Sequence, residues 1–250
     1  MDPSHVVAPW LIRYRVATES NLRLFCFPYA GGSAHVFRKW EQKLPADIEV
    51  CAVEPPGRGT RMREKPFTNL FDVVDAAAEA LGPYMDRPFA FFGHSMGAMI
   101  SFELARYLRR TGRKEPAHLL LSACRAPQLA HTRASTYDLP DREFIEELRR
   151  LKGTPAAVLD HPELLQLILP VLRADFGITQ TYTYRPETPL SCPLSIFGGL
   201  EDDDATRGNL SPWRAHTTAA FSLYMLPGDH FFLNTSQNLL LEIVVRELGG

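Results

Sequence analysis

A serine between two glycines is the first residue of this chain whose setting suggests chemistry. The run Gly93-His94-Ser95-Met96-Gly97 follows an apolar stretch, residues 89–92, and leads into a helical pattern. Gly-x-Ser-x-Gly between a strand and a helix is typical of a nucleophile elbow, a sharp turn that presents a serine hydroxyl at the edge of a sheet. Small flanking residues are expected because the chain must bend tightly there. The motif predicts that Ser95 is the nucleophile of a serine hydrolase.

A serine hydroxyl reacts at neutral pH only when a base takes its proton and a third group orients that base. In hydrolases with such an elbow, the acid and then the histidine follow on loops after later strands. His230 follows the apolar run 222–226 and a glycine turn, and it is the predicted base. His94 is expected to point away from Ser95, and Asp229 is interpreted as a turn residue. The remaining histidines lack a position directly after a strand: His5, His35, His118, His131, His161 and His216.

The predicted acid comes from a short acidic run that follows the apolar stretch 194–197 and the pair Gly198-Gly199. Asp202 is favoured because it lies near the end of the strand. Its neighbours Glu201, Asp203 and Asp204 remain alternatives, and most of the four are expected in a solvated loop.

Two backbone N–H groups are predicted to stabilise the oxyanion that forms when the serine attacks. The first is the N–H of Met96, directly after the nucleophile, and the second comes from the loop after the strand-like run 22–27. Within that loop, Pro28-Tyr29-Ala30-Gly31-Gly32, the predicted donor is Ala30. The two glycines allow the amides to turn inward, although an ordinary turn has the same composition.

Strand-like and helical runs alternate along the rest of the chain. Strands are predicted over 22–27, 49–53, 89–92, 119–123, 194–197 and 222–226, and helices over 71–81, 96–110 and 236–248. Several strands are apolar on consecutive residues, as expected when both faces of a sheet are covered. The pattern predicts one α/β domain over residues 1–250, with a mostly parallel, doubly wound sheet.

The stretch 127–193 breaks this alternation because it contains no convincing strand. Helices are predicted over 140–152 and 160–172, the second kinked or broken at Pro170. A connection of this length in a compact domain is usually functional, which predicts a helical lid over the site. The alternative is a passive packing insert, because long insertions cost little.

Composition limits the classes of partner. The 250 residues carry a net charge of −2, which argues against binding to nucleic acid or to an anionic membrane. No apolar stretch reaches transmembrane length, and residues 1–5 do not begin a signal peptide, so a cytoplasmic protein is expected. The four cysteines are Cys26, Cys51, Cys124 and Cys192, and their spacing is not that of metal ligands. They are expected to be reduced, and the protein is expected to need no metal or cofactor.

Taken together, four segments resemble type II thioesterases, the stand-alone editing hydrolases of polyketide and nonribosomal peptide synthesis. The Phe-Pro-x-Ala-Gly-Gly and Pro-Gly-Arg-Gly segments are more specific than the elbow, and the resemblance covers nearly the whole chain. A Gly-Gly pair before Asp202 and a Leu-x-x-Trp after it also fit the family pattern. The four segments are 25–34, 55–61, 91–98 and 228–232.

The resemblance implies an α/β-hydrolase fold with a helical lid, the triad Ser95, Asp202 and His230, and the amides of Ala30 and Met96 as oxyanion donors. It also implies the substrate, an acyl group in thioester linkage to the phosphopantetheine arm of an acyl- or peptidyl-carrier protein. The partnership is expected to be transient, with a monomer favoured. A loop with Arg58, Arg61 and Arg63 is interpreted either as a docking site for an acidic carrier or as a solvated basic loop.

Other activities remain open from the sequence. They are a general carboxylesterase or lipase, the medium-chain acyl-carrier-protein hydrolase of fatty acid synthesis, a chain-terminating cyclase and a non-catalytic scaffold.

Overall fold

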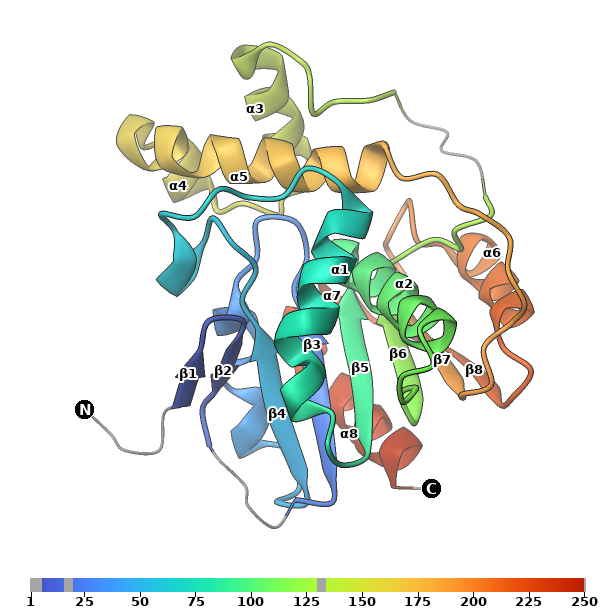
Figure 1. Ribbon diagram of the computed structural model, residues 1–250. Helices are drawn as coiled ribbons and strands as arrows, with labels where there is room; N and C mark the ends of the chain where they lie inside the picture. Colours follow the sequence, from blue (N-terminus) through green and yellow to red (C-terminus); the bar gives the residue numbers. More distant parts are fainter. Residues whose placement is uncertain (1–5, 16–19, 130–133, 250) are drawn as a thin grey trace.

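The computed structural model describes residues 6–15, 20–129 and 134–249. Two subjects of the sequence analysis lie outside these ranges. They are residues 1–5, where no signal peptide was predicted, and His131. Within the described ranges, eight strands form one sheet in the order β1-β2-β4-β3-β5-β6-β7-β8 (Figure 1). The pairs β1–β2 and β2–β4 are antiparallel and the other pairs are parallel. The strands are β1 (Val6–Ala8), β2 (Leu11–Arg13), β3 (Leu22–Phe27), β4 (Ile48–Val53), β5 (Phe89–His94), β6 (His118–Ser122), β7 (Leu194–Gly199) and β8 (Phe221–Leu226).

The predicted, mostly parallel α/β sheet is confirmed. In the described residues, short 3₁₀ helices, η1 to η5, accompany eight α-helices. The α-helices are α1 (Leu70–Leu81), α2 (Met96–Arg110), α3 (Asp141–Leu151), α4 (Ala156–Leu159), α5 (Pro162–Gln180), α6 (Arg207–Leu210), α7 (Phe232–Thr235) and α8 (Gln237–Leu248). The 3₁₀ helices are η1 (Ala34–Phe37), η2 (Trp40–Gln42), η3 (Gly59–Arg61), η4 (Gly82–Tyr84) and η5 (Ser211–His216).

Both faces of the sheet are covered, which explains the consecutive apolar residues in its strands. Phe25 and Phe27 of β3 belong to the core that packs against α1 and α2, whereas Leu24 and Cys26 belong to the core beneath α8. Alternate residues of a strand face opposite sides, so each side receives its own apolar set. Each fully buried Phe or Leu side chain contributes about 1.5–3 kcal/mol to the hydrophobic stabilisation.

The fold differs from the sequence predictions in its first two strands and in helix α5. Strands β1 and β2 have three residues each, too short for a period-2 pattern, and they extend the sheet beyond β4. Helix α5 was expected to end at residue 172 and to be kinked or broken at Pro170, but it stays helical through that proline and continues to Gln180. An interior proline costs about 3 kcal/mol. Burial of Val171 and Leu172, directly after Pro170, offsets part of that cost.

Helices α3, α4 and α5 lie beyond the carboxyl ends of the parallel strands (Figure 1). Within residues 134–193 no strand forms, in line with the absence of a strand pattern there. The three helices share a small apolar core of their own, built around Phe144, Leu148 and Leu159. This layer therefore covers the edge of the sheet at which Ser95 lies.

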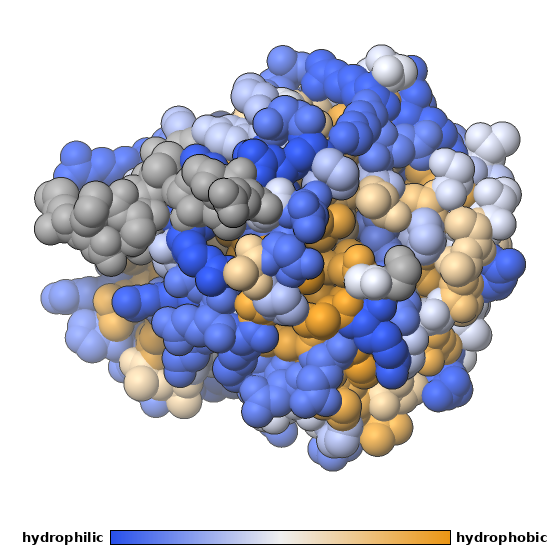
Figure 2. All heavy atoms as spheres, turned by 90° about the horizontal axis from the view of Figure 1, so that it is seen from below, coloured by the Kyte–Doolittle hydropathy of each residue, from blue (hydrophilic) through white to orange (hydrophobic). Residues whose placement is uncertain are grey.

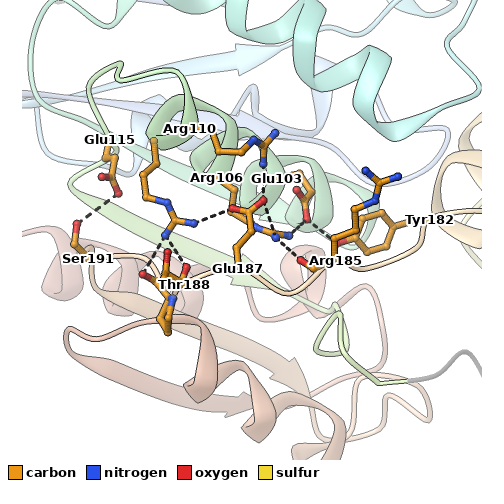
Figure 3. A network of polar contacts seen from close by, with 11 residues as sticks. Glu103, Arg106, Arg110, Glu115, Tyr182, Arg185, Glu187, Thr188 and Ser191 are labelled. Carbon is orange, nitrogen blue, oxygen red and sulfur yellow. Dashed lines mark hydrogen bonds and ion pairs between the residues drawn. The ribbon is translucent and has the colours of Figure 1, made fainter.

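The chain returns from α5 to β7 along α2, held by ionic contacts (Figure 3). The Glu187 carboxylate accepts from Arg106 at 3.0 Å and from Arg109 and Arg110 at 2.9 Å each. Burial works to raise the pKa of Glu187, but the three guanidinium groups outweigh it and lower that pKa below its usual value. Arg106 also pairs with the buried Glu103. The charged side chains of α2 thus anchor the returning segment.

Figure 2 shows the molecule from below, that is, the end opposite to α3, α4 and α5 in Figure 1. Hydrophilic residues dominate that face and surround a smaller hydrophobic area. In the described part of the chain, no helix combines the length and the apolar character that a membrane span requires. The four cysteines are all buried and free.

Candidate active site

Ser95 occupies a strained turn between β5 and α2. Its φ of 54° and ψ of −114° lie in a region that side-chain-bearing residues rarely adopt, and strain of this kind clusters at functional sites. The flanking glycines are required by space rather than by φ. A Cβ on Gly93 would lie 2.2 Å from the Gly97 carbonyl oxygen, and one on Gly97 would lie 2.1 Å from that of Phe27. The turn therefore closes only when both positions lack a side chain.

His230 and Asp202 meet at the ends of β8 and β7. The His230 Nδ1 lies 2.6 Å from Asp202 Oδ2, and Asp202 Oδ1 accepts from the N–H groups of Asp204 at 2.9 Å and Ala205 at 3.0 Å. Burial works to raise the pKa of Asp202, but the bonds from His230 and the two amides outweigh it and hold that pKa below its ordinary value. The carboxylate is thus kept ionised and fixed in orientation.

The neighbouring acids are placed differently from Asp202. Glu201 and Asp203 are exposed, and Asp204 lies 3.9 Å from Arg125. Asp229, beside the histidine, accepts from the N–H of Phe231 at 2.9 Å, as expected of a turn residue. Of the acidic candidates, Asp202 is the one that the fold joins to the imidazole.

The glycine pair at the end of β7 explains why these two loops can touch. A Cβ on Gly199 would lie 2.4 Å from the Asp229 carbonyl oxygen and 2.5 Å from that of Gly228. Directly beyond, the N–H of Glu201 donates to the Gly228 carbonyl at 3.0 Å. A side chain at position 199 would separate the acid from the histidine, so the glycine serves close approach of the two loops.

His94 contacts the backbone of His230, a role that sequence reasoning missed. Its ring is fully buried, with Nε2 2.9 Å from the main-chain oxygen of His230 and Nδ1 2.9 Å from Ser122 Oγ. The carbonyl can only accept, so Nε2 carries the proton and Nδ1 accepts from the hydroxyl. Burial, assisted by the neighbouring His230, lowers the pKa of His94 to about 3. A histidine one residue before the elbow serine was the available signal, because its side chain must point to the opposite face of the strand.

A pH dependence of stability follows from this buried neutral ring. In the unfolded chain His94 gains a proton below about pH 6.5, whereas in the folded protein it stays neutral down to about pH 3. The contribution of the neutral His94 ring to the stability of the fold is therefore complete above pH 6.5 and is lost as the pH falls towards 3. Between pH 6 and pH 4, we expect the free energy of unfolding to decrease with falling pH in the wild type more steeply than in His94→Gln. The difference between the two slopes is expected to be about 1 kcal/mol per pH unit.

Urea unfolding monitored by circular dichroism at several pH values measures this difference. Glutamine keeps an amide donor for the His230 carbonyl but does not titrate, so other acid-sensitive groups contribute equally to both proteins. Parallel pH profiles would show that His94 is protonated in the folded state. His35→Gln, which changes an exposed histidine, is the control and is expected to keep the wild-type slope.

A cavity of about 390 Å³ joins these groups under α3 and α5. Its volume falls in the range of small-molecule sites. Ser95, Asp202 and His230 line it, as do both predicted oxyanion residues, Ala30 and Met96. Met96 opens α2, so its N–H is one of the amides at a helix N-terminus that have no partner within the helix. The helices above contribute an apolar wall: Leu148, Leu151, Leu172 and Phe176.

Comparison with known proteins agrees with this geometry. The thioesterase domain family model matches residues 22–249. The chain is 46% identical to the protein named linear gramicidin dehydrogenase LgrE of Brevibacillus parabrevis, over 99% of this chain and 96% of that protein. The name of LgrE refers to dehydrogenation. The cavity of this chain is lined by a serine, a histidine and an aspartate, side chains that acyl-transfer enzymes use.

Solved structures give the same assignment. RedJ, a thioesterase of the prodiginine pathway in Streptomyces coelicolor, superposes with a TM-score of 0.87 at 40% identity, covering 93% of this chain and 92% of RedJ. YbtT, a type II thioesterase of the yersiniabactin NRPS/PKS pathway, superposes with a TM-score of 0.83 at 31% identity, covering 92% and 93%. The resemblance to type II thioesterases is thereby confirmed, and the chain belongs to the thioesterase domain family.

Proposed function

We propose that this enzyme hydrolyses acyl groups from the phosphopantetheine arm of acyl- or peptidyl-carrier proteins, and that Ser95, His230 and Asp202 are its catalytic triad. The observation that carries the proposal is the 2.6 Å contact between Asp202 and His230 in the cavity that a strained Ser95 also lines. Family membership supports the thioester as the bond that is cleaved. The kinship with RedJ and YbtT supports removal of aberrant acyl units in polyketide or nonribosomal peptide synthesis.

The mechanism follows from the tautomer of His230. Its Nδ1 donates to Asp202, so the neutral ring presents an Nε2 lone pair to the cavity. Ser95 Oγ attacks the thioester carbonyl carbon while Nε2 takes the hydroxyl proton. The C–S bond then breaks, the imidazolium protonates the departing thiolate sulfur to give the free thiol, and an acyl-Ser95 ester remains.

The second half of the reaction repeats these steps with water. His230 takes a proton from a water molecule, the hydroxide attacks the acyl-Ser95 carbonyl, and the serine leaves with its proton restored. The products are a free acid and the carrier thiol. The amides of Ala30 and Met96 are proposed to donate to the oxyanion in both halves, each worth about 3–4 kcal/mol of transition-state stabilisation.

We infer that residues 127–193 act as the lid of a single domain spanning the chain. The position of α3, α4 and α5 beyond the carboxyl ends of the parallel strands and the contribution of α3 and α5 to the cavity walls support this role. A monomer in the cytoplasm is the proposed setting. The four free, buried cysteines support the cytoplasmic location, because thiols persist in reducing compartments.

Relative rates on matched substrates test the proposal. One acyl group would be presented as a carrier-protein thioester, as a small soluble thioester and as an oxygen ester. We expect kcat/KM to be highest for the carrier thioester, by at least about tenfold over the oxygen ester, because carrier contacts add transition-state binding. Equal rates on the oxygen ester would identify a general carboxylesterase. A series of chain lengths on the carrier distinguishes a preference for short units from the medium-chain hydrolase alternative.

A further inference from the structure

A carboxylate on the lid helix reaches the oxyanion loop. Asp175 lies on α5 and is 1% exposed. Its Oδ2 accepts from the Gly31 N–H at 2.7 Å and from Arg58 Nη1 at 2.6 Å, and its Oδ1 accepts from Arg58 Nη2 at 2.8 Å. The ion pair is thus bidentate, and one of its oxygens also holds a backbone amide adjacent to Ala30.

Arg58 completes the contact from the opposite side. Its guanidinium donates to the Gly32 carbonyl at 3.2 Å and to the Pro56 carbonyl at 3.3 Å, and the residue is 6% exposed. Both sequence interpretations of this arginine loop, a docking patch and a solvated loop, are therefore wrong for Arg58. They are also wrong for Arg61, which is buried and pairs with Glu64 at 2.6 Å, whereas Arg63 is exposed. The sequence could not reveal this, because the partner of Arg58 lies 117 residues away.

Glycines allow the helix to lie directly on these loops. A Cβ on Gly31 would come within 2.5 Å of Leu172 Cδ2, and a Cβ on Gly57 within 2.7 Å of Val171 Cγ2. Both glycines also have positive φ, 76° and 86°. The segment of α5 that carries Val171, Leu172 and Asp175 is therefore in contact with the oxyanion loop and with the loop after β4 at once.

We propose that Asp175 and Arg58 are positioning residues for hydrolysis, holding the backbone of residues 29–32 so that the Ala30 N–H faces the oxyanion. This inference rests on the proposed function. The Gly32 N–H donates to the Tyr29 carbonyl at 2.8 Å, which closes residues 29–32 into a turn. Two further backbone groups of that turn are held by the ion pair. Asp175 accepts from the Gly31 N–H, and Arg58 donates to the Gly32 carbonyl. An oxyanion donor is effective only when it is held in place before the charge develops.

Stability alone does not require this arrangement. A buried ion pair loses the hydration of both charges, and replacement of both partners by apolar residues of similar volume is often neutral or stabilising. Removal of one partner leaves the other charge buried and is strongly destabilising. A double substitution therefore separates a positioning role from a structural one more cleanly than either single substitution.

The test compares Arg58→Met/Asp175→Leu and Asp175→Asn with the wild type. Thermal unfolding establishes that each variant folds. For a carrier-bound acyl thioester, kcat is expected to fall at least about tenfold in both variants, with KM changed less than about twofold, because the acyl pocket is retained while an oxyanion donor is displaced. An acyl trifluoromethyl ketone, whose hemiketal with serine carries the same oxyanion, should bind more weakly by a similar factor.

Glu49→Gln is the matched control, because Glu49 is buried and accepts from Arg13 and Arg23 at the other end of the sheet. It is expected to lower stability and leave kcat unchanged. Wild-type kcat in the folded double variant would overturn the inference, as would failure of both site variants to fold while Glu49→Gln folds. Either result leaves the proposed function intact, because wild-type hydrolysis and its dependence on Ser95 are measured separately.

Discussion

Ser95→Ala is expected to lower kcat for an acyl thioester by about 10⁴-fold or more. The hydroxyl oxygen is the only atom of this residue proposed to bond to the substrate, and removal of a triad nucleophile has effects of this size in other serine hydrolases. Residual catalysis above the uncatalysed rate is expected because the oxyanion amides and the binding pocket remain. KM should change little, since the methyl group occupies less space than the side chain it replaces.

Release of free thiol from an acyl-loaded carrier measures this loss. Ser101→Ala is the matched control, because Ser101 is a buried serine in α2 whose hydroxyl donates to the Gly97 carbonyl at 2.7 Å. That variant should keep near wild-type kcat. A fluorophosphonate probe should label the wild type and the control and fail to label Ser95→Ala. More than a tenth of wild-type activity in Ser95→Ala would exclude the proposed mechanism.

Asp202→Asn is expected to lower kcat by about 10³–10⁴-fold without loss of the fold. The asparagine carbonyl can still accept from the N–H groups of Asp204 and Ala205, which turns its NH₂ towards His230 Nδ1. A donor facing Nδ1 forces the imidazole proton onto Nε2, where it cannot act as a base towards Ser95. The effect is therefore larger than loss of one charge would cause.

Asp203→Asn is the matched control, because Asp203 is adjacent in sequence but exposed. Steady-state kinetics on the same thioester, together with thermal unfolding of each variant, compares the two. The assignment of the acid fails when Asp203→Asn loses activity and Asp202→Asn does not. Comparable small losses in both variants would show that the carboxylate contributes through general electrostatics rather than by orienting His230.

Much of this protein is determined by local pattern. The alternation of short, consecutively apolar runs with amphipathic helices specified the sheet, because both patterns are properties of neighbouring residues. The same logic pointed to Ser95 and His230, since Ser95 directly follows β5 and His230 follows β8 after a short turn, at the edge where the carboxyl ends of parallel strands meet. Helix α5 marks a limit of local rules, because packing on both sides of Pro170 overrides the tendency of proline to end a helix.

Only the tertiary structure chose between chemically equivalent candidates. The four consecutive acidic residues 201–204 cannot be told apart by their local sequence. The fold distinguishes Asp202, because its carboxylate is the one that contacts His230. Arg58 and Arg63 lie in one basic loop, yet one is buried against Asp175 and the other is exposed. Spacing along the chain fixes which face a side chain takes. The partner it meets across the fold depends on how distant segments pack, and that information resides in no single window of the sequence.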